Sequence, residues 1–389
     1  MYEKFLSKHV QTIKPSGIRK YFDLSSEMEG VISLGVGEPD FDTPWHIREA
    51  AIYSIESGKT HYTANQGLLE LREEICLYQK RRFQLDYDPV DNVIVTVGGS
   101  EAIDIAMRAI VNPGDEVILM EPSYVAYTQS VELTGAVPVH IKLEHEDQFK
   151  LTPEKLKAAI TPKTKAILMN FPSNPTGGVM TREDYAKLVP ILKEHEIIVI
   201  SDEIYAELTY DGTFCSPANF NEIKDQVIII SGFSKAYAMT GWRLGYVLAN
   251  KTFTDAMNKI HQYIIMSAPT AAQYGAIDAM RNGDIHVAEM RESYMTRRNF
   301  ITKGFNRIGL PTHLPHGAFY IFPDIRGTGL TSDEFCVQLL EDQRVACVPG
   351  TAFGDAGEGF IRVSYAYSID HIREAIERID LFMDKFRQK

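Results

Sequence analysis

The feature that most constrains this chain is a series of short, almost continuously apolar runs separated by longer segments with helical periodicity. The runs are rich in Val and Ile, which favours strands buried on both faces. The intervening segments, such as 101–110 and 182–195, have the apolar spacing of amphipathic helices. This alternation predicts an α/β domain with a mainly parallel sheet flanked by helices. The expected strands are 93–97, 116–120, 166–169, 197–200 and 227–230.

The pattern changes after about residue 280. Helical periodicity over 284–308 is followed by expected strands at 317–322 and 360–365 and by an amphipathic helix over 371–387. This order predicts a smaller α+β domain. We therefore expect a large domain at 45–280 and a small domain formed by 1–44 and 281–389, with a long helix able to bridge the boundary.

Charge and cysteine usage exclude several classes of protein. The net charge of −12 disfavours nonspecific binding to nucleic acid or to an anionic membrane. Neither a secretory leader nor an apolar stretch of roughly 18 residues is present, so no membrane span is expected. Cys76, Cys215, Cys336 and Cys347 lack the spacing of a redox pair or a zinc site. We expect a cytoplasmic protein without a metal, in which these are buried free thiols.

Lys235 follows the run at 227–230, within the segment SGFSKAYAMTGWRLGY at 231–246. Ligands bind at the carboxyl ends of strands in open parallel sheets. Partial desolvation there would lower the pKa of the lysine, as an amine that forms a Schiff base requires. From composition alone, a solvated surface lysine is the more common case. Arg243, in the same segment, could bind phosphate oxygens or form a structural ion pair.

An acidic residue and a glycine turn follow two other expected strands. Asp202 comes directly after 197–200, where a buried carboxylate needs a cation such as a pyridinium, although it could instead cap a helix. Tyr205 could reach the same place with its phenol. Gly98, Gly99 and Ser100 join the first expected strand to a helix, and such a turn can bind an anion. Alone, this turn is a weak signal.

Three further polar or aromatic side chains are candidates. Asn174 follows the expected strand at 166–169 and could donate to a ligand, or could simply form a turn before Pro175. Tyr124 could stack on a planar ring or pack in the core. Arg362 lies in an apolar strand and needs an anion, either a protein carboxylate or a substrate carboxylate. Because so many chemically distinct groups follow strands, a single site is expected at this edge of the sheet.

These segments resemble the signatures of class I aminotransferases, fold type I enzymes that use pyridoxal 5'-phosphate (PLP), in the aspartate/aromatic aminotransferase group. The resemblance covers essentially the whole chain in order. The segments that carry it are SLGVGEPDFDTP, HYTANQGLLELREEI, NFPSNPTGG, SDEIYAEL, SGFSKAYAMTGWRLGY and FIRVSYA.

The resemblance implies a role for each matching position. Lys235 would carry PLP and shuttle the catalytic proton, Asp202 would pair with the pyridine nitrogen, and Tyr124 would stack on the ring. Tyr205 and Asn174 would bind the ring hydroxyl. Arg362, with the Gly37 backbone, would bind the substrate α-carboxylate, and Asn174 would also belong to the substrate site. Tyr62 would reach the phosphate in a neighbouring subunit, which implies a homodimer with shared active sites. The residues implied around the phosphate are Gly99, Ser100, Glu101, Ser231, Ser234 and Arg243.

Two departures from the family pattern bear on the site. Many relatives have Ser three residues before the lysine, where this chain has Gly232, so a different hydroxyl is expected at the phosphate. Aspartate-specific bacterial relatives can carry Lys at the position of Ser100, and the segment 263–266, which resembles the pocket segment of the partner subunit, is apolar. Both departures favour an aromatic or other apolar amino acid.

The implied reaction is ping-pong transamination between an L-amino acid and a 2-oxoacid such as 2-oxoglutarate. Aspartate or N-acetyl-diaminopimelate aminotransferase and a C–S β-lyase remain as alternatives, because a fold and a cofactor do not fix the reaction. A non-catalytic PLP-binding regulator is disfavoured, since no basic patch or additional DNA-binding segment is present.

Overall fold

The computed structural model describes residues 2–7, 10–11, 13, 17 and 28–387. Its largest element is a seven-stranded sheet in the order β2-β8-β7-β6-β5-β3-β4. All neighbouring strands pair in parallel except β8, which is antiparallel to both β7 and β2. Because β8 is reversed relative to both neighbours, β2 points the same way as β3 to β7. The carboxyl ends of these strands therefore meet at one edge of the sheet.

The bounds of the elements are as follows. The strands of the large sheet are β2 (Val93–Thr96), β3 (Glu116–Glu121), β4 (Val137–Lys142), β5 (Thr164–Asn170), β6 (Ile198–Asp202), β7 (Val227–Gly232) and β8 (Gly245–Leu248). The helices before the small domain are α3 (Trp45–Glu56), α4 (Leu69–Phe83), α5 (Gly98–Ile110), α6 (Ala126–Glu132), α7 (Pro153–Ala159), α8 (Arg182–Glu194), α9 (Lys251–Ile264) and α10 (Thr270–Asn282).

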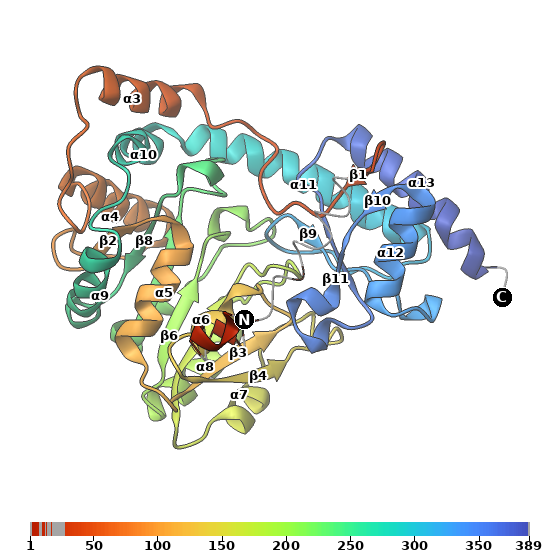
Figure 1. The fold of residues 1–389 in the computed structure, drawn as a ribbon, viewed down its shortest axis with the longest axis horizontal. Helices are drawn as coiled ribbons and strands as arrows, with labels where there is room; N and C mark the ends of the chain where they lie inside the picture. Colours follow the sequence, from red (N-terminus) through yellow and green to blue (C-terminus); the bar gives the residue numbers. More distant parts are fainter. Residues whose placement is uncertain (1, 8–9, 12, 14–16, 18–27, 388–389) are drawn as a thin grey trace.

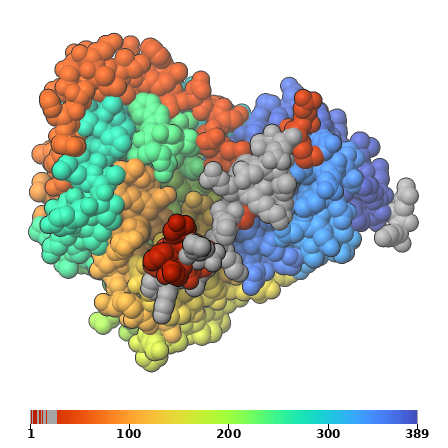
Figure 2. Space-filling view, in the orientation of Figure 1, coloured from red at the N-terminus to blue at the C-terminus, as the bar shows by residue number. Residues whose placement is uncertain are grey.

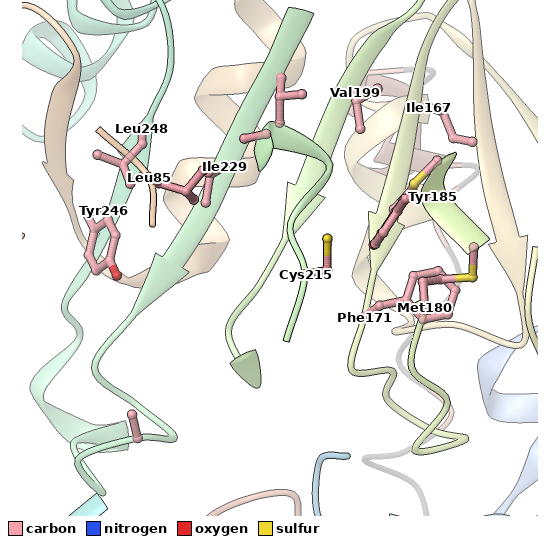
Figure 3. Packing of buried hydrophobic residues seen from close by; sticks show 14 of the residues in the cluster. Leu85, Ile167, Phe171, Met180, Tyr185, Val199, Cys215, Ile229, Tyr246 and Leu248 are labelled. Atoms are coloured by element: carbon pink, nitrogen blue, oxygen red, sulfur yellow. The ribbon is translucent and has the colours of Figure 1, made fainter. Parts of the chain in front are cut away.

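The strands are apolar on both faces because helices cover both faces of the sheet. In β7, Ile229 packs into the core that contains residues of α3, α4, α8 and α10. Its neighbours Ile228 and Ile230 point the opposite way, into the core formed with α5, α6 and α9. Figure 3 shows part of the first core, with Ile229 and Val199 projecting from neighbouring strands. This two-sided burial explains the continuous apolar runs in the sequence.

A second core belongs to the C-terminal part of the chain, drawn in cyan to blue in Figure 1. It is built by helices α11 (Asp284–Arg307), α12 (Ser332–Gln343) and α13 (Ile369–Arg387) against two small sheets. One is antiparallel, in the order β11 (Val348–Pro349), β12 (Ile361–Ser364) and β9 (Tyr320–Ile321). The other pairs β1 (Ile32–Ser33) with β10 (Val345–Ala346), which brings the N-terminal segment into this core.

Helix α11 joins the two parts, as Figure 1 shows. Near its start Val287 packs into the large core, whereas Tyr294 and Phe305 pack into the second core. These two cores support our proposed division into a large domain at 45–280 and a small domain at 1–44 and 281–389. Parts of 1–27 and residues 388–389 of the small domain lie outside the described residues.

Most of the expected elements are present, and the α/β fold with a mainly parallel sheet is confirmed. Five of the described strands were not expected: the two-residue strands β1, β10 and β11 of the small sheets, and β4 and β8 of the large sheet. Edge strand β4 contains Pro138 and has only one buried residue, Ile141, and β8 follows a glycine-rich segment. Among the described residues no helix is both long enough and apolar enough to cross a membrane. All four cysteines are free, but Cys76 is only half-buried, so the expectation of a buried thiol is wrong at that position.

Candidate active site

A cavity of about 730 Å³ lies at the carboxyl edge of the large sheet, where the small domain meets it. Most of the residues singled out in the sequence line it. They are Gly37, Gly99, Ser100, Tyr124, Asn174, Asp202, Tyr205, Ser234, Lys235, Arg243 and Arg362. They converge because the strands that precede them run in the same direction, while Gly37 and Arg362 are brought in by the small domain.

Lys235 lies in the loop between β7 and β8. Its Nζ donates a hydrogen bond to the Gly37 carbonyl at 2.6 Å and lies within 6 Å of the ring centres of Tyr205 (5.8 Å) and Phe319 (5.6 Å). Desolvation by these surroundings lowers the pKa of Lys235 to about 8. The amine therefore becomes a free nucleophile at a pH well below that of a solvated lysine.

Asp202 ends strand β6 and is buried. Its carboxylate accepts hydrogen bonds from the Tyr127 hydroxyl at 2.7 Å and from the Ile204 backbone N–H at 3.1 Å. Burial raises the pKa of Asp202, and the two hydrogen bonds oppose that shift. No Lys or Arg forms a salt bridge with it within the described ranges. It is a buried acid held in place by hydrogen bonds and suited to pair with a cation in the cavity.

Arg362 is buried in β12 and enters the cavity from the small domain. Its Nη1 donates to Asn174 Oδ1 at 3.1 Å, and its Nη2 donates to the Gly35 carbonyl. Its Nε is buried and has no hydrogen-bond partner among the described residues. No carboxylate among the described residues forms a salt bridge with it, so the internal ion pair considered from the sequence is not formed there, and the guanidinium can bind an anion.

The opposite end of the cavity can hold a second anion. Helix α5 begins at Gly98, whose φ is +72° and whose added Cβ would lie 2.8 Å from Arg243 Nη2. Glycine is thus required there both by backbone conformation and by the close guanidinium. Gly99 and Ser100 follow in the first turn, where backbone N–H groups are free to bind an anion. Ser234 adds a hydroxyl to the cavity wall.

Aromatic side chains form much of the remaining wall. The Tyr205 hydroxyl lies 2.9 Å from the Tyr320 hydroxyl, and burial raises the pKa of Tyr205, so its phenol stays protonated. Tyr124 contacts Tyr127 edge to face with ring centres 5.5 Å apart, which leaves it at the cavity instead of in the core. At Gly37 an added Cβ would lie 2.6 Å from the Tyr320 hydroxyl, so this position has no room for a side chain.

Three predicted residues do not line the cavity. Glu101 turns back to accept a hydrogen bond from the Val97 N–H and to contact His261, so it cannot bind the cofactor directly in this structure. Ser231 lies within β7 and contacts the Tyr246 hydroxyl. At Gly232 an added Cβ would approach Gly245 Cα to 3.0 Å, which leaves Ser234 as the serine of this segment that reaches the cavity. Tyr62 is 83% exposed and does not line this chain's cavity.

Several residues that line the cavity were not predicted from the sequence. The Tyr127 hydroxyl donates a hydrogen bond to Asp202. In the sequence, only its position three residues after Tyr124, near the start of a helix, indicates that it could lie at the site. Asn170 fixes the Asn174 backbone and the Asp202 carbonyl through its side chain. Tyr320, from the small domain, had no distinguishing signal.

Comparisons with known proteins show which family this chain belongs to. A sequence profile described as "Aminotransferase class I and II" matches residues 29–379. The chain belongs to this family. The protein YugH of Bacillus subtilis is 54% identical over 381 residues, covering 98% of this chain and 99% of the relative. An aspartate aminotransferase of Pyrococcus abyssi is 43% identical over 378 residues, with 96% and 97% covered. The crystal structure of an aromatic aminotransferase from Pyrococcus horikoshii OT3 superposes with a TM-score of 0.90 at 42% identity, with 95% and 99% covered.

The protein is therefore a fold type I aminotransferase of the aspartate/aromatic group, and its family uses PLP. The cavity of this aminotransferase fits that cofactor. A partly desolvated amine, a buried acid without a cationic partner and an anion-binding turn beside a guanidinium match the aldehyde, pyridine nitrogen and phosphate of PLP. The residues at the two ends thus complement the charges of the cofactor.

Proposed function

We propose that this aminotransferase transfers the amino group between an aromatic or other apolar L-amino acid and a 2-oxoacid such as 2-oxoglutarate. The observation that carries the proposal is the charge of the cavity. Its cationic lining residues are Lys235, Arg243 and Arg362, each of which is needed for PLP or for an α-carboxylate. The described lining has no further Lys or Arg for a side-chain carboxylate, whereas Ile103, Val125 and several tyrosines offer apolar surface.

We assign the cofactor-binding roles from this geometry. Asp202 holds the protonated pyridine nitrogen, and Tyr127 keeps its carboxylate oriented. Arg243 and the turn at 98–100, with Ser234, bind the phosphate. Tyr205 and Asn174 donate to the ring hydroxyl, and Tyr124 stacks on the ring. When bound, PLP supplies an electron-withdrawing ring system that takes up the electron pair left when the substrate Cα–H bond breaks.

The substrate is held from the small-domain side. Arg362 binds the α-carboxylate through the N–H groups that its protein partners leave free, while Asn174 fixes one edge of the guanidinium. Gly37 lets the substrate approach closely, since any side chain there would meet Tyr320. With its carboxylate held by Arg362 and its reacting carbon held at the cofactor, the substrate would present its Cα–H bond toward Lys235.

Lys235 is the proton carrier. Its pKa of about 8 leaves a fraction of the Nζ amine unprotonated near neutral pH, so Nζ would be able to accept the proton of the substrate Cα–H bond and pass it on. A hydrogen bond to the Gly37 carbonyl holds the unmodified Nζ beside the small-domain loop. The aromatic rings around it limit access of water, which strengthens the electrostatic interactions inside the cavity.

We also propose a cytoplasmic homodimer with shared active sites. Exposed apolar side chains cluster around the Tyr62 loop and the end of α9, where Tyr263 is 87% exposed and Ile264 51% exposed. Figure 2 shows the orange segments with α3 and α4 next to the teal segments with α9 and α10, on the side away from the blue small domain. A second copy on this surface would cover these side chains and bring the exposed Tyr62 to the neighbouring phosphate.

A substrate panel tests the proposal. Absorbance changes of the cofactor on mixing with Tyr, Phe, Asp, N-acetyl-diaminopimelate or cystathionine would be followed in single turnovers and compared as kcat/KM. We expect Tyr and Phe to react fastest, and to require an oxoacid for turnover. Preference for Asp or N-acetyl-diaminopimelate would refute the apolar substrate, and pyruvate release from cystathionine without an oxoacid would refute transamination.

A further inference from the structure

A buried histidine–carboxylate pair lies directly behind the anion-binding turn and has none of the roles assigned above. His261, in α9, is fully buried. Its Nδ1 lies 2.6 Å from Glu101 Oε1, and its Nε2 lies 2.8 Å from the backbone oxygen of Asn65. Glu101 Oε2 also accepts from the Val97 N–H at 2.5 Å. The pair thus connects α9, the start of α5 and the loop before α4.

Hydrogen-bonding chemistry fixes the orientation of the imidazole. The Asn65 carbonyl can only accept, so Nε2 of His261 donates to it. One proton then lies between Nδ1 and Glu101, whether it is carried by the ring or by the carboxyl group. In either form each polar atom of the contact has a partner, which a buried network requires in order to be stable. The pair therefore holds its three segments in one arrangement.

The pair contacts two segments, the turn at 98–100 and the loop that carries Tyr62. We assign phosphate binding to both. Glu101 follows Ser100 directly, so its two contacts set the direction of the first turn of α5. Asn65 lies three residues after Tyr62, and its Nδ2 donates to the Met266 carbonyl at 2.8 Å just beyond α9. The Tyr62 loop is thus tied to the same end of α9 by both the backbone and the side chain of Asn65.

We propose that His261 is a positioning residue that holds the phosphate turn at 98–100 and the Tyr62 loop at 61–67 in a fixed relation through Glu101 and Asn65. It touches neither cofactor nor substrate. In a dimer the turn serves the active site of its own subunit and the loop serves that of the partner, so one buried contact sets the phosphate geometry of both sites. The inference rests on the proposed function of these segments.

The test compares His261→Phe, Glu101→Ala and Glu101→Gln with a matched control. The control is His46→Phe, because His46 pairs through Nδ1 with Asp278 between α3 and α10 but does not line the cavity. For each full-length protein, the dissociation constant of PLP would be measured by titration of the apoprotein. Hydrogen exchange of residues 61–67 and 97–101 and the thermal midpoint of the apoprotein would also be recorded.

We expect His261→Phe to weaken PLP binding about 10-fold, the effect of losing roughly one buried charge-assisted hydrogen bond. Exchange should increase in both segments together. Glu101→Ala should weaken PLP binding to the same extent as His261→Phe. Glu101→Gln keeps an acceptor for the Val97 N–H and can donate to a neutral His261. Its affinity for PLP should therefore stay near that of the parent. His46→Phe should lower the thermal midpoint without weakening PLP binding.

Unchanged PLP affinity in His261→Phe, or faster exchange confined to α9, would overturn the inference. If His261→Phe does not fold, the two Glu101 variants decide the matter, since equal PLP affinity in both would overturn it as well. Failure of the parent protein to bind PLP would instead refute the proposed function, so the two failures are distinguishable.

Discussion

Replacing Arg362 with lysine keeps the positive charge but removes the planar fork of the guanidinium. Arg362 has five N–H donors, of which one is used by Asn174 and one by the Gly35 carbonyl, so three have no partner among the described residues. A lysine ammonium has three donors, so only one remains for the substrate after the same two acceptors are satisfied. A guanidinium can hold a carboxylate with two parallel N–H groups, so Arg362→Lys is expected to cost the substrate carboxylate one of two charge-assisted hydrogen bonds.

That loss is worth about 1.5–3 kcal/mol, which corresponds to a fall in kcat/KM of about 10- to 150-fold. The assay is the single-turnover rate with phenylalanine and with 2-phenylethylamine, which has the same side chain but no carboxylate. The variant should lose rate with the amino acid only. Its dissociation constant for 3-phenylpropionate, an unreactive carboxylate, should rise in parallel. An equal loss with the amine would show that Arg362 acts on the architecture of the cavity, and would refute carboxylate binding.

Three other changes test the cofactor side of the cavity. Lys235→Ala should abolish turnover and covalent attachment while PLP still binds noncovalently, as absorbance spectra would show; retained turnover would contradict the assignment. Lys235→Met should stabilise the apoprotein at pH 7, because the folded pKa of about 8 lies below the ordinary 10.5 and the buried charge is unfavourable. This advantage should shrink as the pH rises from about 8 and vanish above 10.5, which urea unfolding across that range would measure. Gly98→Ala should weaken PLP binding more than it lowers kcat, since its Cβ displaces Arg243 and its φ of +72° is strained; equal PLP affinity would exclude that contact.

Much of the site could be predicted because it is built on strand ends. Lys235, Asp202 and Asn174 each follow an apolar run, and parallel strands bring such positions together without any knowledge of side-chain contacts. The direction of β8 could not be read in this way. A strand buried on both faces shows the same apolar pattern whichever way it runs, so only its pairing with β7 and β2 reveals the reversal.

The direction in which a side chain points could not be predicted from the sequence either. Glu101 belongs to the expected anion-binding turn, but its orientation is decided by His261, 160 residues later in the chain. Tyr127 is similar, since its partner Asp202 is 75 residues away. Edge strand β4 was missed for a local reason, because Pro138 and exposed side chains weaken its apolar pattern.

In the function proposed above, the short loop after β1 would fix the two side chains that handle the α-carboxylate and the α-carbon, which all amino acids share. The Gly35 carbonyl positions Arg362, and the Gly37 carbonyl positions Lys235. Both contacts are made by main-chain oxygens, which exist whatever side chains occupy the rest of the cavity wall. Selection acting on wall residues such as Ile103 or Val125 can therefore change which amino acid is accepted without disturbing the handling of its α-carbon. This separation gives the scaffold the freedom to diverge among amino acids while the chemistry at the α-carbon stays the same.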